Sequence, residues 1–205
     1  MMFGKRFSAL RRRMRRNSTR GSAAIEFVFV APIFFGLLFA IIETGIMYFS
    51  QFAVQNAVLQ AARQIRTGQA QSVNAPATAK CTGGSGGSGS GGAYANTGEW
   101  FKDQVCCGIS TLLTCSNLHV AVTDSSGGFG GTNFTNPQVA GQFVAATDAY
   151  PGTINACDVV LVRATYTWSV ITPVLSFFLV NMAGNAHLLA STTAFRNEPY
   201  GAGTC

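Results

Sequence analysis

Charged side chains are scarce in this sequence, and histidine is scarcer still. Asp, Glu, Lys and Arg make up 11% of the 205 residues, and the two histidines are His119 and His187. A soluble domain usually carries about 25% charged residues. Either the surface is largely neutral and polar, or part of the chain lies in lipid. The histidines lie far apart and no nucleophile is patterned with a base, so the sequence predicts neither an enzyme site nor a cofactor.

Acidic residues are missing from the N-terminal end. None precedes Glu26, whereas residues 21–205 carry six basic and eight acidic side chains, a net charge of −2. The formal charge of +6 therefore arises in one segment, residues 1–21. A block of like charge can bind polyanions, but membrane topology is the simpler explanation beside an apolar run, and we predict no nucleic-acid partner. The basic residues of the segment are Lys5, Arg6, Arg11, Arg12, Arg13, Arg15, Arg16 and Arg20.

A long apolar run follows the basic segment. Residues 27–49 are interrupted by one charged side chain, Glu43. As a helix rising ~1.5 Å per residue, this run is about 34 Å long, enough to cross a hydrocarbon core of about 30 Å. A secretory signal peptide has a shorter apolar core followed by an Ala-x-Ala cleavage site, and we find no convincing site here. Because basic residues mark the cytoplasmic side, we predict a cytoplasmic leader over residues 1–21, one span in membrane lipid, and export of the remainder.

The helical pattern continues beyond the apolar run. Val54, Val58, Ala61 and Ile65 recur at spacings of three and four, as on one face of a helix. Gly68 follows as a C-terminal cap. We therefore predict one long helix over residues 22–68, whose outer half packs through this apolar stripe.

The remaining residues divide into a linker and a domain. Residues 69–97 are small and polar, and residues 83–92 are only Gly and Ser, a composition typical of flexible coil. For residues 98–205 we predict an exported, disulfide-containing α+β domain with an antiparallel, pilin-like sheet. The run at 173–180 is too short to span a bilayer, and we interpret it as a core or connecting helix. The other predicted elements are a helix at 99–107 and strands at 117–123, 158–172 and 187–195.

All six cysteines follow the apolar run. An even number in an exported segment predicts disulfides formed in an oxidising compartment. Six cysteines allow 15 pairings, and the adjacent pair at 106 and 107 is expected to have two different partners. A zinc site is less favoured because no clean Cys-x-x-Cys pair is present, and we predict no metal. The candidates are Cys81, Cys106, Cys107, Cys115, Cys157 and Cys205.

The segment Arg-Gly-Ser-Ala-Ala-Ile-Glu-Phe at residues 20–27 resembles the prepilin junction of the TadE family of the tight-adherence (Flp, type IVb-like) pilus. In that family a basic leader ends in Gly before Ala-Ile-Glu-Phe. Residues 31–32, 41–43, 62–68 and 195–200 are also similar to the family. The resemblance is close over residues 20–68, looser over 158–200 and absent from the Gly/Ser segment.

The resemblance implies specific roles at the junction. A prepilin peptidase would cut between Gly21 and Ser22, where small residues leave the backbone unhindered. Glu26, with Phe27, would act in subunit assembly by approaching the N-terminal amine of a neighbouring subunit. The alternative for Glu26 is simple stabilisation by the helix N-terminus and the headgroups. Glu43 is either a helix contact or a side chain that reaches toward the membrane surface.

The function implied is that of a minor pilin or pseudopilin, with no enzymatic activity. Its partners would be the prepilin peptidase, the major Flp pilin, other pseudopilins and the inner-membrane assembly platform. The protein would be a single-pass inner-membrane protein with a cytoplasmic N-terminus and a periplasmic C-terminal domain, or an extracellular one in the assembled pilus. The alternative is an uncleaved single-span anchor of an envelope secretion complex, which binds a partner and never enters a filament.

Overall fold

The computed structural model describes residues 4–69, 97–125, 128–131, 136–144 and 154–200. The chain divides into two units, Met1–Glu43 and Thr44–Cys205, each considered by itself. Helix α1 (Gly4–Arg66) contributes to both. It begins upstream of the predicted start and ends within two residues of the predicted end. Most of the predicted Gly/Ser segment lies outside the described residues.

The described part of the first unit is helical. Among the residues described, one helical stretch, Gly21–Arg66, is long and apolar enough to cross a membrane, and its most apolar 18-residue window has a mean hydropathy of 2.6. Its large apolar side chains face outward: Phe29 is 73% exposed and Ile33 is 68% exposed. An apolar helix exposed in this way is compatible with a single-pass membrane anchor.

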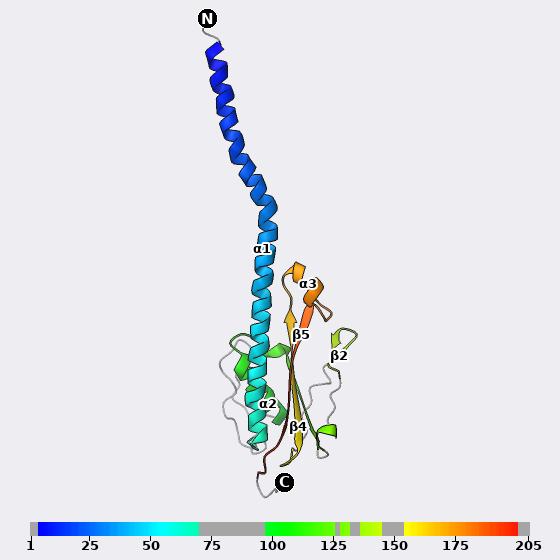
Figure 1. The fold of residues 1–205 in the computed structure, drawn as a ribbon. Helices are drawn as coiled ribbons and strands as arrows, with labels where there is room; N and C mark the ends of the chain where they lie inside the picture. The colour runs from blue at the N-terminus through cyan, green and yellow to red at the C-terminus, as the bar shows by residue number, and fades with distance from the viewer. Residues whose placement is uncertain (1–3, 70–96, 126–127, 132–135, 145–153, 201–205) are drawn as a thin grey trace. The chain divides into compact units, whose positions relative to one another are not determined.

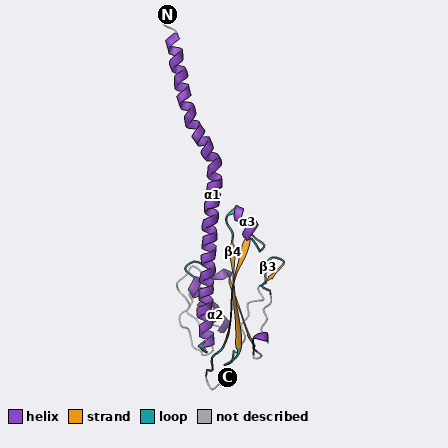
Figure 2. Ribbon diagram, in the orientation of Figure 1, coloured by secondary structure: helices purple, strands orange, loops and turns teal. Residues whose placement is uncertain are grey.

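The second unit packs helices against a three-stranded antiparallel sheet in the order β1-β4-β5 (Figures 1 and 2). This confirms the predicted α+β class and the antiparallel sheet. The helical predictions at 99–107 and 173–180 correspond to α2 and α3, and the three strand predictions to the sheet strands. The elements are α2 (Thr97–Ile109), η1 (Cys115–Asn117), β1 (Leu118–Ser125), η2 (Phe129–Gly131), β2 (Gln138–Val139), β3 (Gln142–Phe143), β4 (Val159–Ser169), α3 (Pro173–Leu179) and β5 (Ala186–Arg196).

The core lies between one face of the sheet and the two longer helices. The stripe predicted on α1 is buried: Val54, Val58 and Ile65 are 0% exposed and Ala61 is 2% exposed. It packs in one cluster with apolar residues of α2 and of alternate sheet positions, because successive strand residues point to opposite faces. The main partners are Trp100, Phe101, Val105, Ile109, Leu118, Val120, Val122, Val160, Val162, Ala164, Tyr166 and Leu189.

The central strand β4 is buried on both faces along most of its length. On the face opposite the helices, Arg163 is 8% exposed and Thr165 is 3% exposed. The hairpin of β2 and β3 adds to this face, since the Phe143 ring lies 4.0 Å from that of His119, the register partner of Thr165. Burial lowers the pKa of the Arg163 guanidinium. Two-sided burial agrees with the β-branched and aromatic composition of β4.

Candidate functional site

The predicted cleavage junction lies on α1 in the first unit. Gly21 and Ser22 are helical and exposed, and no atom lies within 4 Å of the place that a Cβ would take at Gly21. Glycine is a poor helix former, destabilising by about 1 kcal/mol relative to alanine. The junction therefore combines open access with a backbone that unwinds at low cost.

Glu26 lies one helical turn beyond the junction. The Ser22 hydroxyl donates a hydrogen bond of 3.2 Å to Glu26 Oε1, and this contact is exposed. Phe27 is 65% exposed. Residues four apart share one face of a helix, so the Glu26 carboxylate lies on the same face as the residue that would carry a new amine after cleavage.

Glu43 differs from the other acidic residue of α1. It is 8% exposed, whereas the neighbouring Ile41 is 71% exposed. A role for Glu43 in subunit contact stays a prediction.

The second unit brings together the two segments at residues 62–68 and 195–200, which the sequence analysis singled out separately. Arg66 Nε lies 3.2 Å from Glu198 Oε1, and the Glu198 backbone N–H donates to the Arg66 carbonyl at 3.0 Å. That carbonyl is one of the last four of α1, which have no partner within the helix. The C-terminal segment therefore caps α1.

Gly68 and Tyr200 complete the cap at the C-terminal end of α1. Gly68 has a φ of +76°, and a Cβ there would lie 2.6 Å from Tyr200 Cγ. The Tyr200 hydroxyl donates to the Ile154 carbonyl at 2.8 Å, and Asn197 Nδ2 donates to the Asn155 carbonyl at 3.0 Å. Burial raises the pKa of Tyr200, the hydrogen bond with Asn197 lowers it in part, and the Asp158 charge raises it further. The sequence marked Gly68 as a cap, but nothing in it indicated that Tyr200 would cover that cap.

A groove of about 510 Å³ runs beside the Arg66–Glu198 pair, between the end of α1 and β5. Its charged groups are two arginines and one glutamate, and Arg66 is already paired with Glu198. Across the described ranges no group of three or more His, Cys, Asp and Glu side chains could hold a metal ion. The lining residues are Leu59, Ala62, Arg63, Arg66, Thr67, Thr193, Phe195 and Glu198.

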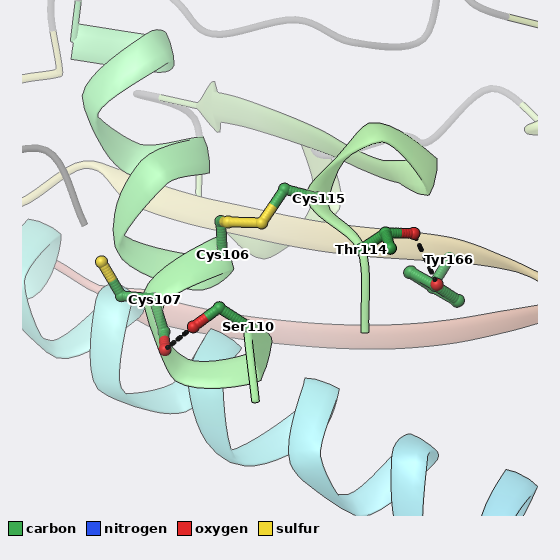
Figure 3. The surroundings of a disulfide bond; sticks show 6 residues. All are labelled: Cys106, Cys107, Ser110, Thr114, Cys115 and Tyr166. Atoms are coloured by element: carbon green, nitrogen blue, oxygen red, sulfur yellow. Dashed lines mark hydrogen bonds between the residues drawn. A yellow bond between two sulfur atoms is a disulfide. The ribbon is translucent and has the colours of Figure 1, made fainter. Parts of the chain in front are cut away.

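A disulfide between Cys106 and Cys115 joins α2 to η1, with 5.5 Å between the Cα atoms (Figure 3). Cys107 and Cys157 are disulfide-bonded as well, so the adjacent cysteines do have different partners. Cys81 and Cys205 lie outside the described residues. Near the bridge, the Thr114 and Tyr166 hydroxyls are 3.3 Å apart, which links the loop after α2 to the central strand.

Two contacts that position α1 against α2 and β5 were not predicted from the sequence. A Cβ at Gly108 of α2 would lie 2.6 Å from Ala57 Cβ of α1, so the helices approach closely at a pair of small residues. Gln51 Nε2 donates to the Ala190 carbonyl of β5 at 2.7 Å. The only sequence signal for the first contact is that both residues are small, and the second joins residues 139 positions apart.

Comparison with known protein families gives a match over part of α1. Residues 21–63 match the family described as TadE-like protein, which confirms the predicted resemblance over that segment. The match begins at Gly21 and includes the apolar run and most of the buried stripe of α1. No curated protein and no solved structure matches the chain.

Proposed function

We propose that this protein is a minor pilin or pseudopilin of a Tad (Flp) pilus, held in the inner membrane by α1 with its second unit exported. The observation that carries the proposal is the TadE-like match over residues 21–63. This pilus-associated family is structural and not enzymatic. The match therefore supports a role in assembly, in which the helix anchors and packs while the folded unit contacts other components.

Processing at the junction is the first step of the proposed mechanism. A prepilin peptidase hydrolyses the Gly21–Ser22 peptide bond and releases the basic leader. Exposure of both residues and open space at Gly21 support access by a protease. The new N-terminal amine belongs to Ser22, and Glu26 becomes the fifth residue of the mature chain.

Assembly is the second step. A carboxylate carried into the bilayer costs up to about 2.5–3.5 kcal/mol on insertion scales, and a partner cation offsets that cost. The hydrogen bond that Glu26 accepts from Ser22 comes from a neutral hydroxyl, which does not neutralise the carboxylate charge. The amine of a neighbouring subunit is the proposed partner, with the exposed Phe27 ring packing beside it.

The partners proposed are the prepilin peptidase, the major Flp pilin, sister pseudopilins and the membrane assembly platform. The alternative function is an uncleaved anchor of an envelope complex, whose leader stays attached. The two functions differ in whether the Gly21–Ser22 peptide bond is cut, so the N-terminus of the mature protein distinguishes them.

The test is the intact mass and N-terminal sequence of the protein purified from native membranes. We expect the wild-type chain to start at Ser22. The variant Gly21→Leu should keep the leader attached. Gly21→Ala is the matched control, and it should still be cleaved. A wild-type chain that retains its arginine-rich leader would overturn the pilin proposal and favour the static anchor.

A further inference from the structure

The connection between β4 and β5 carries an exposed apolar surface, which we call the tip surface and define as Ile171, Phe177 and Phe178. These side chains are 82%, 87% and 76% exposed. The two phenylalanine rings form an edge-to-face pair with centroids 5.2 Å apart. The apolar run at 173–180 predicts a core or connecting helix, and α3 is a connecting helix that turns both rings outward.

The segment that carries the tip surface has no charged side chain. Residues 170–186 contain no Asp, Glu, Lys, Arg or His. Two aromatic rings this exposed on α3 are unfavourable in water, at about 25 cal/mol per Å² of apolar area. Exposed apolar patches of this kind mark sites of contact with a protein or a membrane.

The position of the tip surface within the second unit follows from the register of α1 against β5. Gln51 bonds to Ala190 and Arg66 pairs with Glu198, so α1 and β5 run in the same direction. Since Ala186 begins β5, α3 lies at the end of the unit where α1 enters at Thr44. His187 Nδ1 also bonds the Leu179 carbonyl, which ties α3 to the start of β5.

The same end of the unit exposes apolar side chains of α1. Tyr48 is 61% exposed, Phe49 is 60% exposed and Phe52 is 64% exposed. Residues 44–49 belong to the run that the sequence predicts to lie in the membrane. The tip surface therefore lies at the same end of the unit as the outer limit of the predicted span.

We propose that the tip surface inserts into the interface of the membrane that holds α1, as a second and shallow lipid contact. This inference rests on the proposed membrane anchor. Apolar side chains of interfacial helices lie about 5–10 Å into the headgroup and acyl boundary, and Phe177 and Phe178 belong to a segment with no charged residue that would oppose such insertion. The contact would fix the tilt of the exported unit on the bilayer before assembly.

A second copy of the chain is the competing occupant. A specific protein interface buries about 1,200–2,000 Å² in total and has a polar rim, whereas the tip surface consists of three apolar side chains on and just before a seven-residue helix, in a segment without charged residues. A bilayer needs neither a large area nor a matched rim, and the covalent link to α1 keeps it close.

The experiment places tryptophan at the tip in the full-length protein, reconstituted in vesicles of phosphatidylcholine with or without bromine on the acyl chains. Phe177→Trp and, independently, Phe178→Trp should add emission that is blue-shifted and largely lost in the brominated vesicles. The signal of the unsubstituted chain, from Trp100 and Trp168, is subtracted. Unchanged disulfide content, measured by intact mass without reduction, confirms that each variant is folded.

Phe129→Trp is the matched control, because Phe129 is also exposed, at 61%, but it follows the end of β1 that pairs with Val159, at the far end of the sheet. Its emission should resist bromine. Phe34→Trp, in the predicted span, reports the anchor itself. Quenching at position 34 without quenching at 177 and 178 overturns the inference and leaves the anchor standing. No quenching at position 34 overturns both. Blue-shifted but unquenched emission at 177 and 178 means that protein covers the tip, which also overturns the inference.

Discussion

Gly68 stands at a position where a side chain meets two separate obstacles. Its φ of +76° is left-handed, and a Cβ would lie 2.6 Å from the Tyr200 ring. The left-handed conformation costs an L-residue about 1–2 kcal/mol, and overpacking adds about 1–3 kcal/mol. We expect Gly68→Ala to lower the free energy of unfolding by the sum of these effects, measured by urea denaturation in detergent with tryptophan emission as the probe.

Gly184→Ala separates the two costs. Gly184 has a φ of +81° but no atom within 4 Å of its Cβ position, so only the backbone cost applies. If Gly68→Ala were no worse than Gly184→Ala, Tyr200 would not be packed over the cap as described.

The Tyr200 hydroxyl predicts a pH dependence. Its bond to the Ile154 carbonyl contributes about 1 kcal/mol, so Tyr200→Phe should be less stable by that amount near neutral pH. Burial raises the folded-state pKa of Tyr200 above 10.0. A raised pKa gives stability that is complete below the unfolded pKa and is lost as the pH rises through the folded pKa. The gap between the parent and Tyr200→Phe should therefore narrow above about pH 10, in urea titrations at matched pH. A constant gap would contradict this sign.

Among single residues, Glu26 gives a prediction about function. Glu26→Gln keeps the size and the hydrogen bond to Ser22 but removes the charge, so leader removal should continue while incorporation into pili is lost. The measurements are the mature mass and the amount of protein in sheared pili. Glu43→Gln, on the buried side of the same helix, is the comparison. Normal incorporation of Glu26→Gln would refute the proposed pairing with a neighbouring amine.

At the scale of elements, the contact between α1 and α2 depends on two small residues. A Cβ at Gly108 would lie 2.6 Å from Ala57 Cβ and 3.2 Å from Ala57 Cα, and a backbone atom cannot move aside as a flexible side chain can. Alanine improves helix propensity by about 0.5–1 kcal/mol, but overpacking costs about 1–3 kcal/mol. We expect Gly108→Ala to be destabilising overall in urea denaturation.

Gly45→Ala is the helical control for this prediction, because nothing lies within 4 Å of its Cβ position. It should be neutral or stabilising. A Gly108→Ala variant as stable as Gly45→Ala would mean that the helices do not approach as closely as the structure has them.

Local pattern was enough to predict the larger elements but not their arrangement. The strands predicted at 117–123 and 158–172 agree with the bounds of β1 and β4 to within three residues. Strand side chains alternate between two faces, and this period of two is visible in the sequence at 117–123, whereas 158–172 is a β-branched run. The two-residue strands β2 and β3 are too short to leave such a pattern. The order β1-β4-β5 depends on how distant surfaces fit, and no local signal carries that information.

For the molecule as a whole, the sequence predicted the junction and the apolar anchor because each is a contiguous segment. It also marked residues 62–68 and 195–200 as similar to the family, yet only the fold shows that Glu198 and Tyr200 close the end of α1. The tip surface escaped prediction for a related reason: an apolar run of eight residues reads the same whether the fold buries it or leaves Phe177 exposed.

Orientation is the property of the whole molecule that the basic leader predicts. Each Lys or Arg near an anionic membrane surface contributes about 1 kcal/mol, and eight such residues precede the apolar run. Replacing Arg11, Arg12, Arg13, Arg15 and Arg16 by Gln withdraws most of that attraction. A fraction of the chains should then leave the second unit in the cytoplasm, where thiols stay reduced. Alkylation without reduction, followed by intact mass, counts those chains as species with tagged cysteines.

The same five positions changed to Lys give the matched control, because the charge is kept while the same five arginines are lost. These chains should be exported and untagged, with Cys106 and Cys115 bridged as in the parent. If the Gln variant were also fully untagged, the leader charge would not orient the protein, and export would have to be directed by the apolar run or by the folded unit itself.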